Sequence, residues 1–202
     1  MVLIPSEEVG GKERGDHGMA MIDAIMKANE AYVPSKGMKY AKEDPAVAKL
    51  PAKHLAIVTC MDTRLVNMME NAMGLQRGDA NVIKVAGNVI EPFGDVMRSI
   101  LVSVYELGAN EVIVVGHDGC GMEKTTAASL ADKMKQRGID AEAIADVYAT
   151  LERWADSFTC AHLNVEKAVQ VLRAHPLLPK DVSISGCIMN PATGELTKVD
   201  TI

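Results

Sequence analysis

Aromatic residues are scarce in this chain, at 3% of its 202 residues, although hydrophobic residues make up 48%. A core therefore has to be built from Ala, Val, Ile, Leu and the 13 Met, and the length suffices for one well-packed domain. Cysteine is also rare, with four residues, which excludes a disulfide-stabilised scaffold. We expect the thiols to be free or metal-bound in a reducing compartment, and we predict a cytoplasmic location.

An excess of positive charge and a long apolar run are both missing. The formal net charge is −6 and the basic residues are scattered, which argues against a nucleic-acid-binding surface. No apolar stretch approaches the length that spans a membrane, and Met1–Pro5 is too short for a signal peptide. No Gly-x-Gly-x-x-Gly motif follows the first two predicted strands, which argues against a dinucleotide cofactor. We therefore expect neither a nucleic acid nor a membrane as a partner.

The first 50 residues are predicted to form an N-terminal segment, and residues 51–202 the main domain. Met1–Asp16 is rich in Gly and charge without periodicity, which is typical of a mobile arm. Met19–Val33 has apolar residues at helical spacing, which predicts an amphipathic helix. The polar segment Pro34–Pro51 is interpreted as a linker, and its length suggests that the helix packs away from the main sheet, on a partner subunit.

The main domain alternates buried strands with helices, which is the pattern of an α/β fold with a mainly parallel sheet flanked by helices. The predicted strands are the apolar runs Leu55–Thr59, Asn81–Ala86, Glu111–Gly116 and Val182–Met189. The predicted helices are Leu65–Met73, Asp95–Leu107, Thr125–Arg137, Ala141–Asp156 and Val165–Ala174. After a turn, Glu195–Val199 is predicted to return as a hairpin strand on the sheet edge.

Reactive side chains follow two of the predicted strands. The first strand continues into Cys60, Asp62 and Arg64, and the third into His117 and Cys120. If these strands are parallel neighbours, the side chains meet at one edge of the sheet, where α/β proteins bind ligands. Two thiolates and one imidazole are preferred Zn²⁺ ligands, and three protein ligands leave a fourth tetrahedral position open for water. The sequence therefore predicts a catalytic zinc site held by Cys60, His117 and Cys120.

Asp62 and Arg64 are predicted to be catalytic residues beside this metal. A carboxylate two residues from a ligand reaches the open position, and a bidentate contact from Arg64 would hold it ionised and oriented. The alternative is a solvated salt bridge in a turn, which would contribute little. For Cys60 and Cys120, the alternatives to metal ligation are structural packing and a redox pair.

Gly87 follows the second predicted strand, and two interpretations of it stay open. Its backbone approaches the substrate pocket closely, or the glycine serves only the turn. The remaining cysteines and histidines do not follow a predicted strand beside another potential ligand or a charged pair. They are expected to be packing or surface residues: Cys160, Cys187, His17, His54, His162 and His175. Among them His162 is the weakest exclusion, because a proton shuttle on a helix near the mouth of the site would suit a histidine.

With Cys-x-Asp-x-Arg at Cys60–Arg64 and His-x-x-Cys at His117–Cys120, the chain resembles the β-class carbonic anhydrases, and most of all the short archaeal and bacterial type. The similarity covers most of Leu55–Val199, including Gly78–Lys84, Ala86–Asn88, Cys120–Met122 and His175–Pro179. It implies a mainly parallel α/β sheet, a dimer as the building unit, and Zn²⁺ held by the residues that match Cys60, His117 and Cys120. The chain departs from residues that are common in the family at Val85, Asp118 and Gly119.

The activity that this resemblance implies is the reversible hydration of carbon dioxide to bicarbonate and a proton by a zinc-bound hydroxide. Hydrolases of carbonyl sulfide and carbon disulfide have similar sequences and form one alternative. A non-catalytic zinc-binding homologue forms another, and the departures from the family pattern are what favours it. The family shows an open state, in which we expect Asp62 to pair with Arg64, and a closed state, in which Asp62 would ligate the metal.

Overall fold

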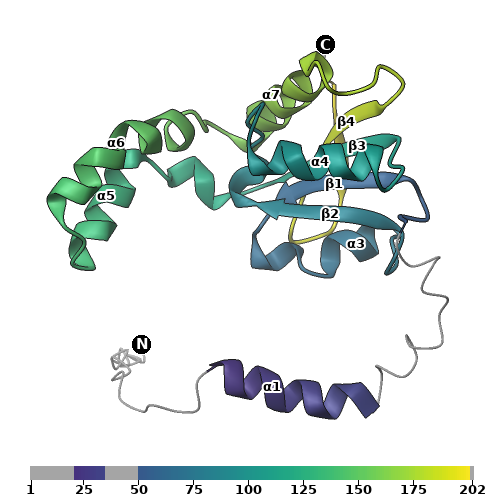
Figure 1. Ribbon diagram of the computed structural model, residues 1–202, viewed down its shortest axis with the longest axis horizontal. Coiled ribbons are helices and arrows are strands. Elements are labelled where there is room, and N and C mark those ends of the chain that lie inside the picture. The colour runs from purple at the N-terminus through teal and green to yellow at the C-terminus, as the bar shows by residue number, and fades with distance from the viewer. Residues whose placement is uncertain (1–20, 35–49, 201–202) are drawn as a thin grey trace, which may run out of the picture. The chain divides into compact units, whose positions relative to one another are not determined.

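The computed structural model describes residues 21–34 and 50–200, and the chain divides into two units, residues 1–44 and 45–202. In the first unit, α1 (Met21–Tyr32) confirms the helix predicted from apolar spacing (Figure 1). Its apolar side chains are exposed, Ile22 by 60% and Ile25 by 53%. The predicted arm at Met1–Asp16 and nearly all of the predicted linker lie outside the described residues.

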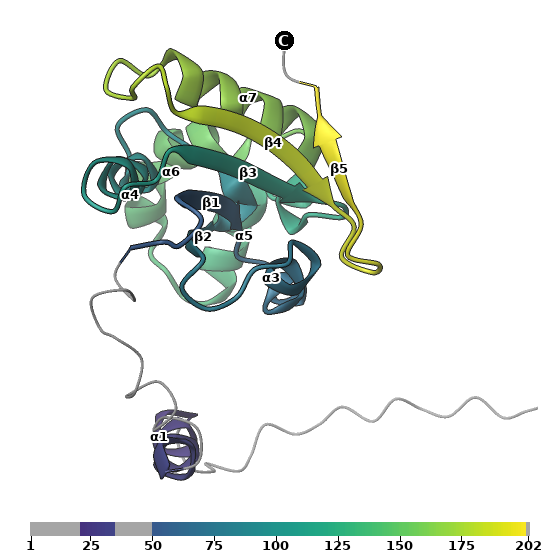
Figure 2. The ribbon, with the colours of Figure 1, turned by 90° about the vertical axis from the view of Figure 1, so that its right-hand side faces the viewer.

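The second unit is built around a five-stranded sheet in the order β2-β1-β3-β4-β5. The strands are β1 (Leu55–Cys60), β2 (Ala80–Val85), β3 (Glu111–His117), β4 (Ser183–Met189) and β5 (Leu196–Val199). The first four are parallel, and β5 returns antiparallel to β4 at the edge, as Figure 2 shows. The predicted fold class, with its hairpin strand at the sheet edge, is therefore confirmed.

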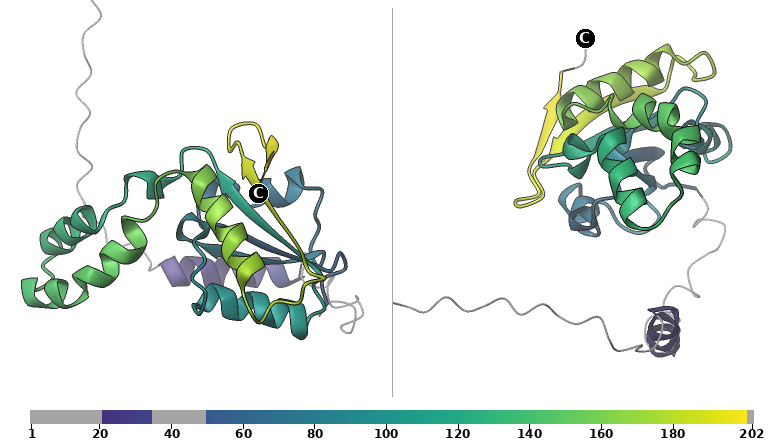
Figure 3. Two further views of the ribbon diagram at one scale, coloured as in Figure 1. Left: turned by 90° about the horizontal axis from the view of Figure 1, so that it is seen from above. Right: turned by 90° about the vertical axis from the view of Figure 1, so that its left-hand side faces the viewer.

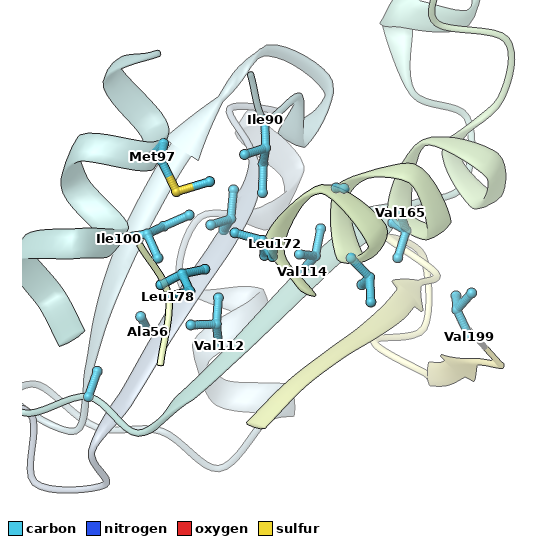
Figure 4. Packing of buried hydrophobic residues seen from close by; sticks show 14 residues of the cluster. Ala56, Ile90, Met97, Ile100, Val112, Val114, Val165, Leu172, Leu178 and Val199 are labelled. Carbon is cyan, nitrogen blue, oxygen red and sulfur yellow. The ribbon is translucent and has the colours of Figure 1, made fainter. Parts of the chain in front are cut away.

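Period-two alternation along the central strands divides the core between the two faces of the sheet. Ala56 and Val58 of β1 face one side, where they share a hydrophobic cluster with Ile100 and Leu172 from two covering helices (Figure 4). Ile57 faces the other side and belongs to a second cluster with Leu65, Met69 and Phe158. Because all six residues of β1 are buried, the end of this strand is fixed by packing on both faces.

The helices of the second unit follow the predicted order, with two corrections. They are α3 (Met68–Ala72), α4 (Asp95–Tyr105), α5 (Ala127–Gln136), α6 (Ala141–Ala155) and α7 (Ala161–Ala174), with 3₁₀ turns η3 (Thr63–Leu65), η4 (Ala86–Asn88) and η5 (Gly121–Lys124). The α4 and α7 helices cover one face of the sheet, whereas α5 and α6 pack on each other beside it (Figure 3). None of the helices in the described residues is long and apolar enough to cross a membrane.

The first correction concerns the predicted helix Leu65–Met73, which was wrong as a single element. The chain forms η3 and then α3, because Asn67 between them adopts a left-handed backbone with φ of 61° that interrupts helical hydrogen bonding. The second correction concerns α7, which begins at Ala161 rather than Val165. The amide of Ala161 donates to the carboxylate of Glu123, so a distant residue replaces the local N-cap that a sequence pattern would reveal.

Candidate metal centre

Neighbouring parallel strands deliver the predicted metal ligands to one edge of the sheet. β1 pairs with β3 up to Thr59 opposite Val115, and Cys60 and His117 stand at the carboxyl ends of these two strands. Cys120 follows three residues later in the turn after β3. The two sulfurs and an imidazole nitrogen all lie within 4.8 Å of one another, and all three residues are buried. The structure thus brings together the three residues that the sequence singled out.

The geometry of this cluster fits Zn²⁺. Two sulfurs that each lie about 2.3 Å from a tetrahedral zinc are separated by about 3.8 Å, and the sulfurs of Cys60 and Cys120 are 3.9 Å apart. Nδ1 of His117 lies 3.0 Å from the carbonyl oxygen of Asp118 and donates to it, so the lone pair of Nε2 stays available. Nε2 is buried without a hydrogen-bond partner, so its lone pair is free to bind a metal ion.

Electrostatics favour negative charge at the two sulfurs. The hydrogen bond with Cys120 lowers the pKa of Cys60 to about 4, and His117 and the backbone amides of Gly87 and Asp62 act in the same direction, against burial. The same hydrogen bond, together with burial, raises the pKa of Cys120, so the two sulfurs share one proton. A cation that contacts both sulfurs replaces this proton. A soft anionic pair of this kind, joined by one imidazole, matches the ligand preference of zinc.

Asp62 and Arg64 form a bidentate ion pair beside the cluster. Nε and Nη2 of Arg64 donate to Oδ1 and Oδ2 of Asp62, each at 2.9 Å, and the backbone amide of Arg64 donates to Oδ1 at 2.9 Å. The guanidinium holds the pKa of the Asp62 carboxyl at about 2, well below its usual range. Oδ2 also lies 3.7 Å from Nε2 of His117. This is the expected open arrangement, in which the carboxylate faces the cluster but belongs to Arg64.

Main-chain groups supply the next layer of contacts, at two of the three positions where the sequence departs from the family pattern, Asp118 and Gly119. The carbonyl of Asp118 accepts from His117, and the carbonyl of Gly119 accepts from Nη2 of Arg64 at 3.1 Å. Neither contact uses a side chain of residue 118 or 119. The hydrogen bonds that orient the ligand and the arginine therefore use no side chain at either position, although the φ of 62° at Gly119 favours glycine there.

Gly87 lies against the first ligand. It is buried and left-handed, with φ of 62°, and its amide hydrogen-bonds to the sulfur of Cys60. A Cβ at this position would stand 2.7 Å from a ring carbon of Phe158 and 2.9 Å from Cγ of Met122, which only glycine avoids. Its role as a lining residue of a substrate pocket stays a prediction.

Among the histidines set aside by the sequence, none that the structure describes joins the Cys60–His117–Cys120 group, although His162 lines a pocket with Asp118 and Gly119. His175 is buried and packs with Nε2 2.8 Å from the carbonyl of Pro92, and His54 lies 2.9 Å from the carbonyl of Gly108. His162 is exposed and lies 3.4 Å from Glu166. His17 lies outside the described residues. The free thiols of Cys160 and Cys187 are half-buried and belong to no metal-ligating group in the described part of the chain.

Sequence reasoning missed the residues that support the two ligand-bearing turns. Asn164 donates to the carbonyl of Gly87 at 2.8 Å, Glu123 accepts from Ala161, and Phe158 packs on Gly87. These contacts join residues separated by up to 77 positions. No local sequence pattern predicts these contacts. The alternation of strands and helices predicts only that α7 packs near the strands.

Comparison with known proteins decides the family. The carbonic anhydrase family model matches residues 55–196, a span that begins with β1 and ends at the start of β5. The chain belongs to the carbonic anhydrase family. Membership in this family and the Cys–His–Cys cluster assign Zn²⁺ as the cofactor. The predicted resemblance to the β-class carbonic anhydrases is confirmed.

Individual relatives agree with this family. The Bacillus subtilis protein YvdA is 42% identical over 185 residues, covering 90% of this chain and 92% of the relative. Beta-carbonic anhydrase 1 of Mycobacterium tuberculosis is 34% identical over 150 residues, covering 74% and 83%. The crystal structure of beta-carbonic anhydrase isoform I from Trichomonas vaginalis superposes with a TM-score of 0.83 at 39% identity, covering 91% of this chain and 99% of that one. A carbon disulfide hydrolase of Acidithiobacillus thiooxidans is 31% identical over 155 residues, covering 71% and 76%.

Proposed function

We propose that the protein catalyses the reversible hydration of carbon dioxide to bicarbonate and a proton, with Zn²⁺ held by Cys60, His117 and Cys120. The observation that carries this proposal is the buried cluster of two sulfurs and an imidazole whose Nε2 has no partner. Three ligands fill three tetrahedral positions and leave one for water, which is the arrangement of catalytic rather than structural zinc. When bound there, Zn²⁺ acts as a Lewis acid and lowers the pKa of water so that a nucleophile is available near neutral pH.

Asp62 and Arg64 are proposed to orient the nucleophile. Because its pKa is held at about 2, Asp62 is ionised at neutral pH and only accepts hydrogen bonds. Oδ2, 3.7 Å from the ligand atom of His117, faces the reaction site and would accept the hydrogen bond of the attacking water. Arg64 keeps the carboxylate in this orientation through its planar fork, and its contact with Gly119 fixes the fork in turn.

The substrate pocket is proposed to include the backbone of Gly87. Carbon dioxide is small and apolar, and a glycine beside a metal ligand leaves room for it without adding a competing polar side chain. Gly87 satisfies this description because it lies against Cys60 and its own polar groups are engaged by Cys60 and Asn164.

Stopped-flow measurement of carbon dioxide hydration, together with zinc stoichiometry, tests the proposal. The zinc-loaded protein is expected to contain one Zn²⁺ per chain and to hydrate carbon dioxide. Asp62→Asn is expected to keep the metal and to lower kcat/KM by roughly 10- to 100-fold. Asp132→Asn makes the same change on α5, at a side chain that is 70% exposed and outside the zinc site, and is expected to leave zinc content and kcat/KM unchanged. Zinc binding without hydration would instead support a non-catalytic homologue.

The second candidate is hydrolysis of carbon disulfide or carbonyl sulfide at the same site. The relatives named carbon disulfide hydrolases, at 31% identity for the Acidithiobacillus thiooxidans protein, are the observation that favours it. Both substrates are linear and share an electrophilic carbon with carbon dioxide, so the same nucleophile attacks each. Hydrogen sulfide release from either compound, at a kcat/KM above that for carbon dioxide hydration, would reassign the substrate.

A homodimer, or a multiple of it, is the proposed assembly. The apolar side chains of α1 are exposed in the described residues, and an exposed apolar helix face is typical of an interface. In this arrangement residues 1–50 form an arm and residues 51–202 the zinc domain. Sedimentation of the zinc-loaded chain at micromolar concentration is expected to give at least twice the chain mass of 21.7 kDa, and a monomer would contradict the proposal.

The proposed location is the cytoplasm. The site needs two cysteines in the thiolate form, and a reducing compartment keeps such thiols from oxidation. Fluorescence imaging of the tagged protein, or fractionation of the source cells, tests this proposal.

A further inference from the structure

The start of α7 lies against both turns that carry metal ligands. One turn is η4, whose Gly87 donates to the sulfur of Cys60, and the other is η5, which begins directly after Cys120. The α7 helix contacts η4, and η4 contacts η5. Among the described residues the helix contributes no metal ligand, so its role in function is not explained by the metal-binding group itself.

Asn164 fastens the first turn. Its side-chain Nδ2 donates to the carbonyl of Gly87 at 2.8 Å, while the amide of the same glycine donates to the Cys60 sulfur. The asparagine is partly buried, one helical turn from Ala161. The carbonyl belongs to the peptide group that follows Gly87 and the N–H to the one that precedes it, so Asn164 acts on the N–H by fixing the backbone of Gly87 that joins the two. The direction of the hydrogen bond to Cys60 therefore depends on Asn164.

Glu123 fastens the second turn. Its Oε1 accepts from the backbone amide of Ala161 at 3.1 Å and so caps the N-terminus of α7, where the local N-cap residue provides no side-chain hydrogen bond. The preceding residue, Met122, donates its backbone amide to the sulfur of Cys120. The hydrogen bond between Ala161 and Glu123 thus joins the segment beside the Cys120 sulfur to the first turn of α7, the turn that also carries Asn164.

Side-chain packing adds contacts between the same segments. Phe158, just before α7, and Met122 of η5 pack so closely on Gly87 that a Cβ there would lie 2.7 Å and 2.9 Å from their side chains. On the strand that ends in His117, Gly116 leaves space for Val165 of α7, because a Cβ there would lie 2.7 Å from Cγ2 of that residue. Two hydrogen bonds and two glycine contacts therefore converge on the first turns of one helix.

We propose that α7 sets the spacing of the two thiolate ligands, with Asn164 and Glu123 as positioning residues that act through Gly87 and Met122. This inference rests on the proposed zinc site and extends it to residues without contact to the metal. Hydrogen bonds that orient ligands influence metal affinity by about 10- to 100-fold when they are removed. Because both tethers act on the sulfurs, their loss is expected to alter the metal–sulfur interaction itself and not only the stability of the helix.

The test compares variants that keep the shape of the side chain. Asn164→Asp removes the donor to Gly87 without changing size, and Gln170→Glu makes the same amide-to-carboxylate change at an exposed position of α7. Glu123→Gln keeps an oxygen acceptor for Ala161, whereas Glu123→Ala removes it. Zinc affinity is measured by competition with a chelator, and the sulfur-to-metal charge-transfer bands are recorded after Co²⁺ substitution.

Asn164→Asp and Glu123→Ala are expected to weaken zinc affinity by about 10- to 100-fold and to shift the Co²⁺ bands. Gln170→Glu and Glu123→Gln are expected to match the wild-type protein. Wild-type zinc affinity and an unchanged Co²⁺ spectrum in folded Asn164→Asp would overturn the inference and leave the proposed function intact. If that variant does not fold, Asn164→Ala, which introduces no charge, is measured in its place. Failure of the wild-type protein to bind zinc would overturn both.

Discussion

Arg64 holds Asp62 with a two-pronged hydrogen bond and uses the same Nη2 to reach the carbonyl of Gly119. One side chain therefore links the turn after β1 with the turn after β3. The carboxylate lies 3.7 Å from Nε2 of His117, and the guanidinium keeps it there. In the proposed function, this ion pair positions the carboxylate for the reaction.

The first prediction concerns this pair. Arg64→Ala frees Asp62 to turn toward the metal ligands, and we expect kcat/KM for hydration to fall by roughly 10- to 100-fold. Arg64→Lys keeps the charge but not the planar fork, so its activity is expected to lie in between. Stopped-flow kinetics and the Co²⁺ spectrum measure both effects. Arg98→Ala removes an exposed pair with Asp95 and serves as the control. Full hydration activity in zinc-replete Arg64→Ala would contradict the assigned role.

The second prediction concerns the metal ligands. Cys60→Ser and Cys120→Ser are expected to lose most of their zinc and all measurable hydration activity, because a serine hydroxyl is a far weaker zinc ligand than a thiolate. Cys160→Ser and Cys187→Ser make the same change at half-buried positions outside the cluster and are expected to keep one Zn²⁺ per chain. Elemental analysis after dialysis provides the measurement. A full metal content in either ligand variant would show that the site lies elsewhere.

The strands and the three clustered residues could be predicted from the sequence because the signals are local. A β-branched apolar run predicts a buried strand, and a thiol or imidazole at its end predicts where that group emerges. For example, Leu55–Thr59 differs from β1 by a single residue, and Cys60 stands where the strand ends. Parallel neighbours then follow from the strand and helix alternation.

The parts that the sequence could not predict depend on contacts between distant residues. The early start of α7 needs the carboxylate of Glu123, 38 positions away, and the role of Asn164 needs Gly87, 77 positions away. The break before α3 depends on one left-handed asparagine, a conformation that this residue type permits but does not require. Gly87 is an example, since the sequence does not distinguish a glycine that a turn requires from one that is required because Phe158 packs against it.

The third prediction follows from the use of main-chain groups around His117. Because the carbonyl of Asp118 orients the imidazole, Asp118→Asn is expected to leave zinc content unchanged and hydration activity close to that of the wild-type protein. Asp62→Asn is the matched comparison, because it makes the same change where the side chain itself is used. Elemental analysis and stopped-flow kinetics on both variants provide the measurement. Loss of zinc from Asp118→Asn would show that the carboxylate of residue 118 supports the site.

The last prediction separates backbone strain from packing at Gly87. Gly87 and Gly74 are both left-handed, with φ of 62° and 67°, and this conformation costs an L-residue roughly 1–2 kcal/mol. A Cβ on Gly74 would meet nothing within 4 Å, whereas one on Gly87 would stand 2.7 Å from Phe158 and 2.9 Å from Met122. Gly74→Ala is therefore expected to lower the free energy of unfolding by roughly 1–2 kcal/mol, and Gly87→Ala by about 1–3 kcal/mol more, the usual cost of overpacking.

Urea denaturation of the zinc-loaded variants, followed by circular dichroism, measures the two losses. Adding Phe158→Leu to Gly87→Ala is expected to recover part of the difference, because the smaller side chain gives the new Cβ room and the two changes are in contact. The same substitution in the wild-type background should only destabilise, since it leaves a cavity. Equal losses for Gly74→Ala and Gly87→Ala would mean that Phe158 and Met122 move aside at no cost. In that case packing against Phe158 and Met122 would not hold the turn that supports Cys60, and the hydrogen bond from Asn164 would have to do so.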